Sequence, residues 1–406
     1  MAHGLVSTGV SFPDGTVQAT AGEAVGGGDE LNIERGFMAV AHDGSPFITV
    51  YGHDHSILNA LPDPSGLPTG DGRGTAFSPD GTYLSVAHDI SPFITIYKRS
   101  GDVFTKLANP SVLPTGTGWG TAFSPDGTYL SVAHWTSPFI TIYKRSGDTF
   151  TKLANPSVLP TGIGNGTAFS PDGTYLSVAH WTSPFITIYK RSGDTFTKLA
   201  NPSVLPAGAG NGTAFSPDGT YLSVAHETSP FITIYKRSGD TFTKLANPSA
   251  LPPSAGRGTA FSPDGTYLSV VHAASPFITI YKRSGDVFTK LANPTGGLPT
   301  DAGYGTAFSP DGTYLSVAHD ISPFITIYKR SGDVFTKLAN PSVLPTGTGY
   351  GTAFSPDGTY LSVAHWNPPF IAIYKRSGDT FTKLANPGVL PTGFGFGVAF
   401  WAPPQT

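Results

Sequence analysis

The chain has 406 residues, of which only 13% are charged, and its formal net charge is −3. Such weak charge argues against a nucleic-acid-binding surface or an anchor to anionic membranes. Cysteine is absent, which excludes disulfides and thiolate metal sites, and no run of 18 apolar residues predicts a membrane-spanning helix. The first residues, MAHGLVSTGV, contain no basic segment and no long apolar run, so we expect no signal peptide.

An N-terminal arm, residues 1–27, lies outside the repeats that fill the rest of the chain. It contains the segment VSFPDGTVQATA, and three glycines follow at 26–28. This segment resembles a short sequence that recurs in bacteriophage tail-fibre and other virion proteins. The resemblance implies that the arm attaches the protein to a virion or oligomerises it. The alternative is a hairpin that shares its turn with the repeats. The candidate attachment residues are Phe12, Pro13, Asp14 and Gly15.

Near-identical repeats occupy the chain from about residue 28. The string FSPDGTYLSV begins at residues 77, 123, 169, 215, 261, 308 and 354, so the period is 46 residues with one step of 47. The string SPFITIYKRSGD follows each copy and becomes PPFIAIYKRSGD in the last. A degenerate copy begins at Phe37, so the motif VAH or VVH occurs eight times. A fixed period of this length indicates a repeat architecture.

Each period contains four short segments rich in aromatic and β-branched residues, bounded by turn residues such as Pro-Asp-Gly and Ser-Gly-Asp. Four strands in about 46 residues are typical of one β-propeller blade, and no segment shows a sustained helical period. For the copy that follows Gly74, we predict strands at Thr75–Ser78, Thr82–His88, Phe93–Lys98 and Val103–Ala108.

The two ends of the chain predict how the ring closes. The last repeat is followed by Gly397-Val398-Ala399-Phe400, which begins a ninth copy, whereas the first copy has only a poor first strand at 28–34. We predict that 398–400 completes the first blade, because a ring must leave no open sheet edge. The fold class is therefore all-β, an eight-bladed propeller over residues 28–406. If 28–34 formed the first strand instead, the number of blades would remain eight.

The string FSPDGTYLSVAH followed by SPFITIY resembles the WD-repeat-like and lactonase-like YVTN propellers, in which a Ser-Pro-Asp-Gly turn opens the second strand. The Trp-Asp pair that gives the WD family its name is missing. The resemblance covers nearly the whole chain from about residue 28 and implies the propeller fold. It does not by itself specify a function.

The copies differ mainly at two positions, one just before the first strand and one just after the repeated histidine. Strand parity places both positions on one face of the disc, whereas the hairpins of the other face barely vary. Aromatic rings beside polar groups suit sugars, whose C–H faces stack and whose hydroxyls need hydrogen bonds. Neutral drift is the alternative, but it would not favour exposed aromatic residues. The candidate ligand-binding residues are Arg73, Trp119, Trp135, Asn165, Trp181, Asn211, Glu227, Arg257, Tyr304, Tyr350, Trp366 and Phe396.

Metal binding and catalysis are weakly indicated. The repeated histidines end identical strands and cannot reach one another around one ion, so we interpret them as structural. His53-Asp54-His55 has a metal-ligand spacing, but we favour a solvated hairpin loop. A general acid and base need groups in unlike environments, whereas the repeats present one environment eight times. We therefore expect no enzyme, no catalytic residue, no metal and no cofactor.

These observations favour a bacteriophage virion protein of the tail-fibre type, whose propeller face recognises a host-surface glycan or receptor. The expected location is the virion, on a tail or capsid surface. The expected partners are other virion proteins and the host glycan or receptor. A homo-oligomer is compatible with these observations. We expect no nucleic-acid binding and no membrane insertion. One alternative is a capsid or tail decoration protein with a purely structural role. A second is a lactonase-like propeller enzyme, which requires polar residues unique to one sector of the central channel.

Overall fold

The computed structural model describes residues 10–11, 17–18, 36–53 and 58–403. The chain divides into two compact units, Met1–Glu34 and Arg35–Thr406. In the first unit, β1 (Val10–Ser11) pairs antiparallel with β2 (Val17–Gln18). The predicted attachment residues lie outside the described residues; these are Phe12, Pro13, Asp14 and Gly15. The alternative first strand, 28–34, also lies outside them.

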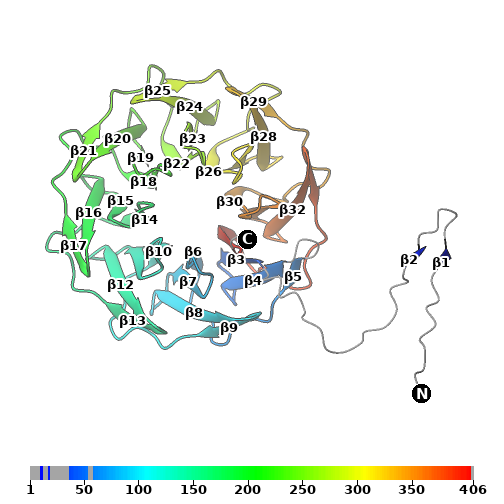
Figure 1. Ribbon diagram of the computed structural model, residues 1–406, viewed down its shortest axis with the longest axis horizontal. Coiled ribbons are helices and arrows are strands. Elements are labelled where there is room, and N and C mark those ends of the chain that lie inside the picture. The colour runs from blue at the N-terminus through cyan, green and yellow to red at the C-terminus, as the bar shows by residue number, and fades with distance from the viewer. Residues whose placement is uncertain (1–9, 12–16, 19–35, 54–57, 404–406) are drawn as a thin grey trace. The chain divides into compact units, whose positions relative to one another are not determined.

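The second unit is an eight-bladed β-propeller, as predicted, and each blade is a four-stranded antiparallel sheet. Figure 1 shows the blades around a common axis, with one strand of each blade nearest that axis. The innermost strands are β6 (Gly72–Phe77), β10 (Gly118–Phe123), β14 (Gly164–Phe169), β18 (Gly210–Phe215), β22 (Gly256–Phe261), β26 (Gly303–Phe308), β30 (Gly349–Phe354) and β34 (Gly395–Trp401). The second strands are β3 (Gly36–His42), β7 (Tyr83–His88), β11 (Tyr129–His134), β15 (Tyr175–His180), β19 (Tyr221–His226), β23 (Tyr267–His272), β27 (Tyr314–His319) and β31 (Tyr360–His365).

The outer half of each blade repeats with the same regularity. The third strands are β4 (Ile48–His53), β8 (Ile94–Ser100), β12 (Ile140–Ser146), β16 (Ile186–Ser192), β20 (Ile232–Ser238), β24 (Ile278–Ser284), β28 (Ile325–Ser331) and β32 (Ile371–Ser377). The fourth strands are β5 (Leu58–Ala60), β9 (Val103–Lys106), β13 (Thr149–Lys152), β17 (Thr195–Lys198), β21 (Thr241–Lys244), β25 (Val287–Lys290), β29 (Val334–Lys337) and β33 (Thr380–Lys383). No helix in the described residues could cross a membrane.

Strand boundaries differ slightly from the prediction for local reasons. The third strand of the second blade begins at Ile94 because Phe93 has φ of 64°, which an extended strand cannot adopt. The innermost strand begins earlier than expected, at Gly72, because an irregular pairing near its start extends the ladder.

The C-terminal strand closes the ring, as predicted. In the first blade the strand order is β34-β3-β4-β5, so the last strand of the chain lies beside the first strand of the propeller. Phe37 is opposite Trp401 in this pair, and Ala39 is opposite Ala399. The pairing leaves the first blade with the same four strands as the others.

The hydrophobic core lies between neighbouring blades, because both faces of each sheet carry apolar residues. Between the third and fourth blades, Tyr129 and Ile142 of one sheet pack with Leu176, Val178 and Phe196 of the next. Equivalent clusters occupy the other junctions. Burial of apolar area at every junction is the main source of stability for such a ring.

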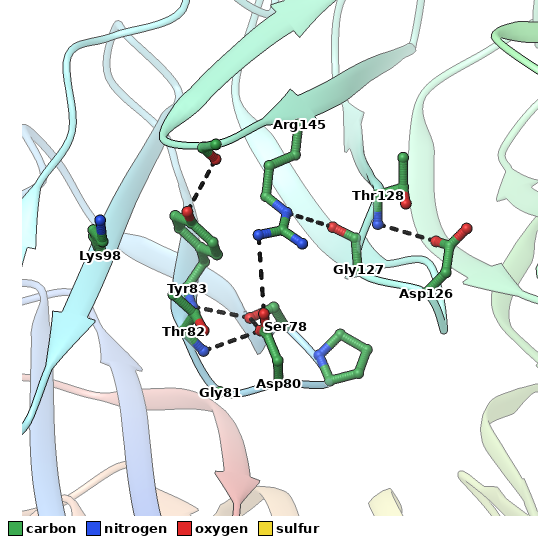
Figure 2. A network of polar contacts seen from close by, with 12 residues as sticks. Ser78, Asp80, Gly81, Thr82, Tyr83, Lys98, Asp126, Gly127, Thr128 and Arg145 are labelled. Atoms are coloured by element: carbon green, nitrogen blue, oxygen red, sulfur yellow. Dashed lines mark hydrogen bonds and ion pairs between the residues drawn. The ribbon is translucent and has the colours of Figure 1, made fainter.

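A polar network repeats at the edges of these junctions, and Figure 2 shows one copy. The Tyr83 hydroxyl donates to Asp148 of the next blade at 2.7 Å, and Lys98 pairs with the same carboxylate at 2.8 Å. The guanidinium of Arg145 lies over the Tyr83 ring at 4.8 Å and donates through Nε to Gly127 O. These contacts recur along the chain with identical residue types, so we assign them to blade docking rather than to ligand binding.

Candidate functional site

The first variable position of every blade lies in a β-bulge on the innermost strand. In the second blade, Gly72 pairs with His88 and Gly74 with Ala87, so Arg73 is the extra residue between two paired glycines. A bulge leaves its residue outside the ladder and re-aims its side chain. The same register shift occurs in all eight blades, at Arg73, Trp119, Asn165, Asn211, Arg257, Tyr304, Tyr350 and Phe396.

Close packing requires the first glycine of every bulge and, in some blades, the second glycine as well. A Cβ on Gly118 would lie 2.7 Å from Phe93 O, and one on Gly74 would lie 2.7 Å from Trp119 O. Only glycine fits such approaches without a shift of the backbone. The Gly-x-Gly pattern therefore presents one variable side chain per blade near the axis, while its neighbours carry none.

We call the eight bulge residues the inner ring, because most of them contact the next one. The guanidinium of Arg73 lies 4.6 Å from the Phe396 ring and 5.4 Å from the Trp119 ring. Arg257 lies over Tyr304 at 4.2 Å, and Tyr350 is 5.0 Å from Tyr304. On the remaining side, the amides of Asn165 and Asn211 each donate to a backbone carbonyl of the following blade, Gly210 O and Gly256 O.

The second variable position, just after the repeated histidine, lies beside the inner ring. Trp135 is 6.0 Å from Trp119, and Trp366 is 5.8 Å from Tyr350. Trp135, Trp181 and Trp366 are 46%, 47% and 42% exposed, and Glu227 is also exposed. The structure thus brings together the two sets that the sequence placed on one face, and it exposes three large aromatic surfaces there.

One sector of the inner ring carries a cluster of ionisable groups that the other blades lack. Arg73 Nη2 donates to Asp71 Oδ2 at 3.1 Å and lies 3.7 Å from Asp89 Oδ2. The three side chains are only 21%, 31% and 27% exposed. Arg73 Nε and Asp89 Oδ1 are buried and make no hydrogen bond with any described group. Buried polar atoms without a partner are costly unless a water molecule or a ligand meets them.

The pKa of Asp71 is raised above its usual value near 3.8. Burial is the largest cause, and the neighbouring carboxylates of Asp89 and Asp43 add to it, while Arg73 acts in the opposite direction. A carboxyl group with a raised pKa beside a guanidinium is a candidate general base next to an electrophilic partner. We call Asp71, Arg73 and Asp89 the acidic sector.

Sequence analysis named Arg73 as a candidate but missed Asp71. The signal was present, because the residue two before the bulge also varies among the copies. At this third variable position, only the second blade has a carboxylate. The other blades have Thr117, Ile163, Ala209, Ala255, Ala302, Thr348 and Phe394.

The repeated histidines are structural in geometry. All eight are fully buried, and seven share a hydrogen bond between Nε2 and a threonine on the next strand, as His134 does with Thr141 at 3.0 Å. Burial lowers the pKa of each to about 4. His365 is the exception in its bonding, because Ala372 stands where the threonine would be and neither ring nitrogen has a hydrogen-bond partner among the described residues.

The expectation that His53 lies in a solvated hairpin loop is wrong, whereas Asp54 and His55 are outside the described residues. His53 ends strand β4, is 5% exposed and packs against Tyr360 at 5.3 Å. It occupies the place of the arginine that covers a tyrosine at six of the other junctions. No group of three or more metal-ligating side chains occurs among the described residues.

Comparisons with known proteins show the fold of this chain. No protein-family model and no curated protein matches the sequence. Among solved structures, it is similar to a candidate 6-phosphogluconolactonase from Bacteroides uniformis, with 15% identity, 91% of this chain and 100% of that chain covered, and a TM-score of 0.59. It is also similar to a periplasmic gluconolactonase from Pseudomonas aeruginosa, with 16% identity, coverage of 91% and 99%, and a TM-score of 0.59.

These comparisons correct two expectations. The interpretation as a bacteriophage protein of the tail-fibre type is wrong, because solved structures that this propeller resembles are named for lactonase activity. The expectation that the chain is not an enzyme is wrong for the same reason. That expectation rested on the identity of the repeats, whereas Asp71 is not repeated. The resemblance of the arm to phage proteins is likewise without support in these comparisons.

Proposed function

We propose that the chain is a lactone-hydrolysing enzyme and that the acidic sector is its active site. The observation that carries this proposal is the pairing of Asp71, whose pKa is raised, with the guanidinium of Arg73 in one blade only. The similar structures named as gluconolactonases support the same reaction class. Trp119 and Phe396 flank Arg73 and give the site apolar walls.

In this proposal, the Asp71 carboxylate accepts a proton from a water molecule as the water oxygen attacks the lactone carbonyl carbon. Negative charge then develops on the carbonyl oxygen, where N–H groups of Arg73 stabilise it. When the tetrahedral intermediate collapses, the ring C–O bond breaks. The ring oxygen takes the proton held by Asp71, and the product is a hydroxy acid. Asp89 acts as a positioning residue, because it lies 3.7 Å from Arg73 and fixes the direction of the guanidinium.

The aromatic surfaces beside the acidic sector fit a sugar-derived lactone. Trp119 contacts both Arg73 and Trp135, so an indole surface runs outward from the sector. Such a surface suits the C–H face of a sugar ring, while charged groups recognise its oxygens. The names of the similar structures point to gluconolactone or its 6-phosphate as the first substrates to test.

The test is a rate measurement of acid release from δ-gluconolactone and from 6-phosphogluconolactone, corrected for spontaneous hydrolysis. We expect Asp71→Asn to lower the enzymatic rate about 100-fold or more, since a positioned general base contributes roughly 10²–10⁴-fold. The control is Asp63→Asn, which removes an exposed carboxylate outside the inner ring, in the loop after β5, and should leave the rate unchanged. A wild-type rate no faster than the spontaneous one on either lactone would overturn the proposal, as would full activity in Asp71→Asn.

A further inference from the structure

The inner ring contains a second cation, Arg257, in surroundings unlike those of Arg73. The two residues occupy equivalent bulges in the second and sixth of eight blades, so strands β6 and β22 lie on opposite sides of the axis (Figure 1). Arg73 pairs with Asp71 and Asp89. At the positions equivalent to these carboxylates, the sixth blade has Ala255 and Ala273.

Arg257 is therefore a positive charge without a carboxylate beside it among the described residues. Its Nη1 atom is buried and makes no hydrogen bond with any described group. A buried donor left without an acceptor costs free energy, and the cost is larger for a charged group. A site that keeps such a donor is suited to an acceptor supplied by a ligand.

The surroundings of Arg257 favour an anion in particular. The guanidinium lies over the Tyr304 ring, with Cζ 4.2 Å from the ring centroid, and this cation–π contact helps to hold it in place. Tyr350 lies next to Tyr304, and burial raises its pKa to about 12, so its phenol stays neutral and adds no negative charge. The Asp320 carboxylate lies near Tyr350 and accepts a hydrogen bond from Thr348 at 2.7 Å instead of forming an ion pair with Arg257. A planar guanidinium matches the two oxygens of a carboxylate or a phosphate.

We propose that Arg257, supported by Tyr304, binds a small oxyanion on the inner ring, a phosphate or a carboxylate, at a subsite separate from the acidic sector. The anion supplies the acceptor that Nη1 lacks. In the enzyme proposed above, this subsite would select lactones that carry an acidic group, and that role alone rests on the proposed function. Anion binding itself needs no turnover.

The test measures binding of inorganic phosphate and, separately, of acetate to the full chain by isothermal titration calorimetry at low ionic strength, because salt screens such contacts. Arg257→Gln removes the cation. Ala255→Asp keeps the cation and installs the carboxylate that Arg73 has at 3.1 Å. A side chain fits at position 255, because equivalent positions carry threonine, isoleucine or phenylalanine. Lys290→Gln removes a positive charge from the outer strand β25 of the same blade and serves as the control.

We expect wild type and Lys290→Gln to bind one of the two anions, and both ring variants to bind it at least about tenfold more weakly. Preference for phosphate or for acetate identifies which oxyanion the subsite takes, and either result supports the inference. Failure of wild type to bind both anions overturns it, and so does unchanged binding by Ala255→Asp with normal thermal unfolding. Anion binding without lactone hydrolysis would reject the proposed function and leave this inference standing.

Discussion

Trp401 is the side chain on which ring closure depends most directly. It is 6% exposed, stacks on Phe37 at 6.1 Å and lies under the guanidinium of Arg99 at 4.7 Å. Its Nε1 donates to Pro79 O of the second blade at 2.9 Å. Trp401→Ala removes these contacts from the junction between the last strand and two blades. Truncation of a buried tryptophan costs about 3–5 kcal/mol, and the lost hydrogen bond is included in that figure.

The assay is equilibrium unfolding in guanidinium chloride, with the shift in midpoint multiplied by the slope of the transition. The control is Trp135→Ala, because Trp135 is 46% exposed and packs beside Trp119 and Trp181 on the surface. We expect a loss of about 1 kcal/mol or less for the control. Equal losses in the two variants would refute the reasoning, because closure would then depend little on the packing of the last strand.

Two further predictions concern the buried histidines. Their pKa of about 4 in the folded chain lies below the value of 6.5 expected when unfolded, so the unfolded state binds more protons between these values. The free energy of unfolding should therefore be highest above pH 6.5 and fall toward pH 4, by up to about 1.4 kcal/mol per pH unit for each histidine. A melting temperature that does not change between pH 7.5 and 5 would contradict this prediction. Ala372→Thr should stabilise the chain by about 0.5–1.5 kcal/mol, because it gives His365 the partner present in the other blades, and a lower melting temperature would show that the site cannot accept it.

The fold could be predicted from the sequence because the same pattern of strands and turns occurs eight times. The spacing of the turns fixed the four strands of each blade, and the fragment 397–400 indicated the closing strand. Bounds of strands were less predictable, since the positive φ of Phe93 depends on its loop and not on its own strand propensity. The Gly-x-Gly pattern was visible, but the bulge that it allows appears only when the two strands are paired.

The candidate site was predicted only in part, for a physical reason. Comparison of the copies located Arg73 and Arg257, because these positions vary. The raised pKa of Asp71 depends first on burial and then on Asp89 and Asp43, which the fold brings near it from other strands or from another blade. A comparison of repeats identifies the residues that differ between blades, but it does not show which of these residues lie in contact in the folded chain. The weight given to a short N-terminal segment also misled the interpretation, since that segment carries no information on the chemistry of the inner ring.

The most direct test of the central claim is the dependence of lactone hydrolysis on pH, measured as kcat/KM for wild type and Asp71→Asn. If Asp71 is the general base, wild-type activity is complete above the raised pKa of this carboxyl and falls as pH decreases through it, because only the ionised form accepts a proton. We predict that Asp71→Asn loses both the activity and this ascending limb. An Asp71→Asn variant with the rate and the pH profile of wild type would contradict the assignment of the acidic sector as the active site.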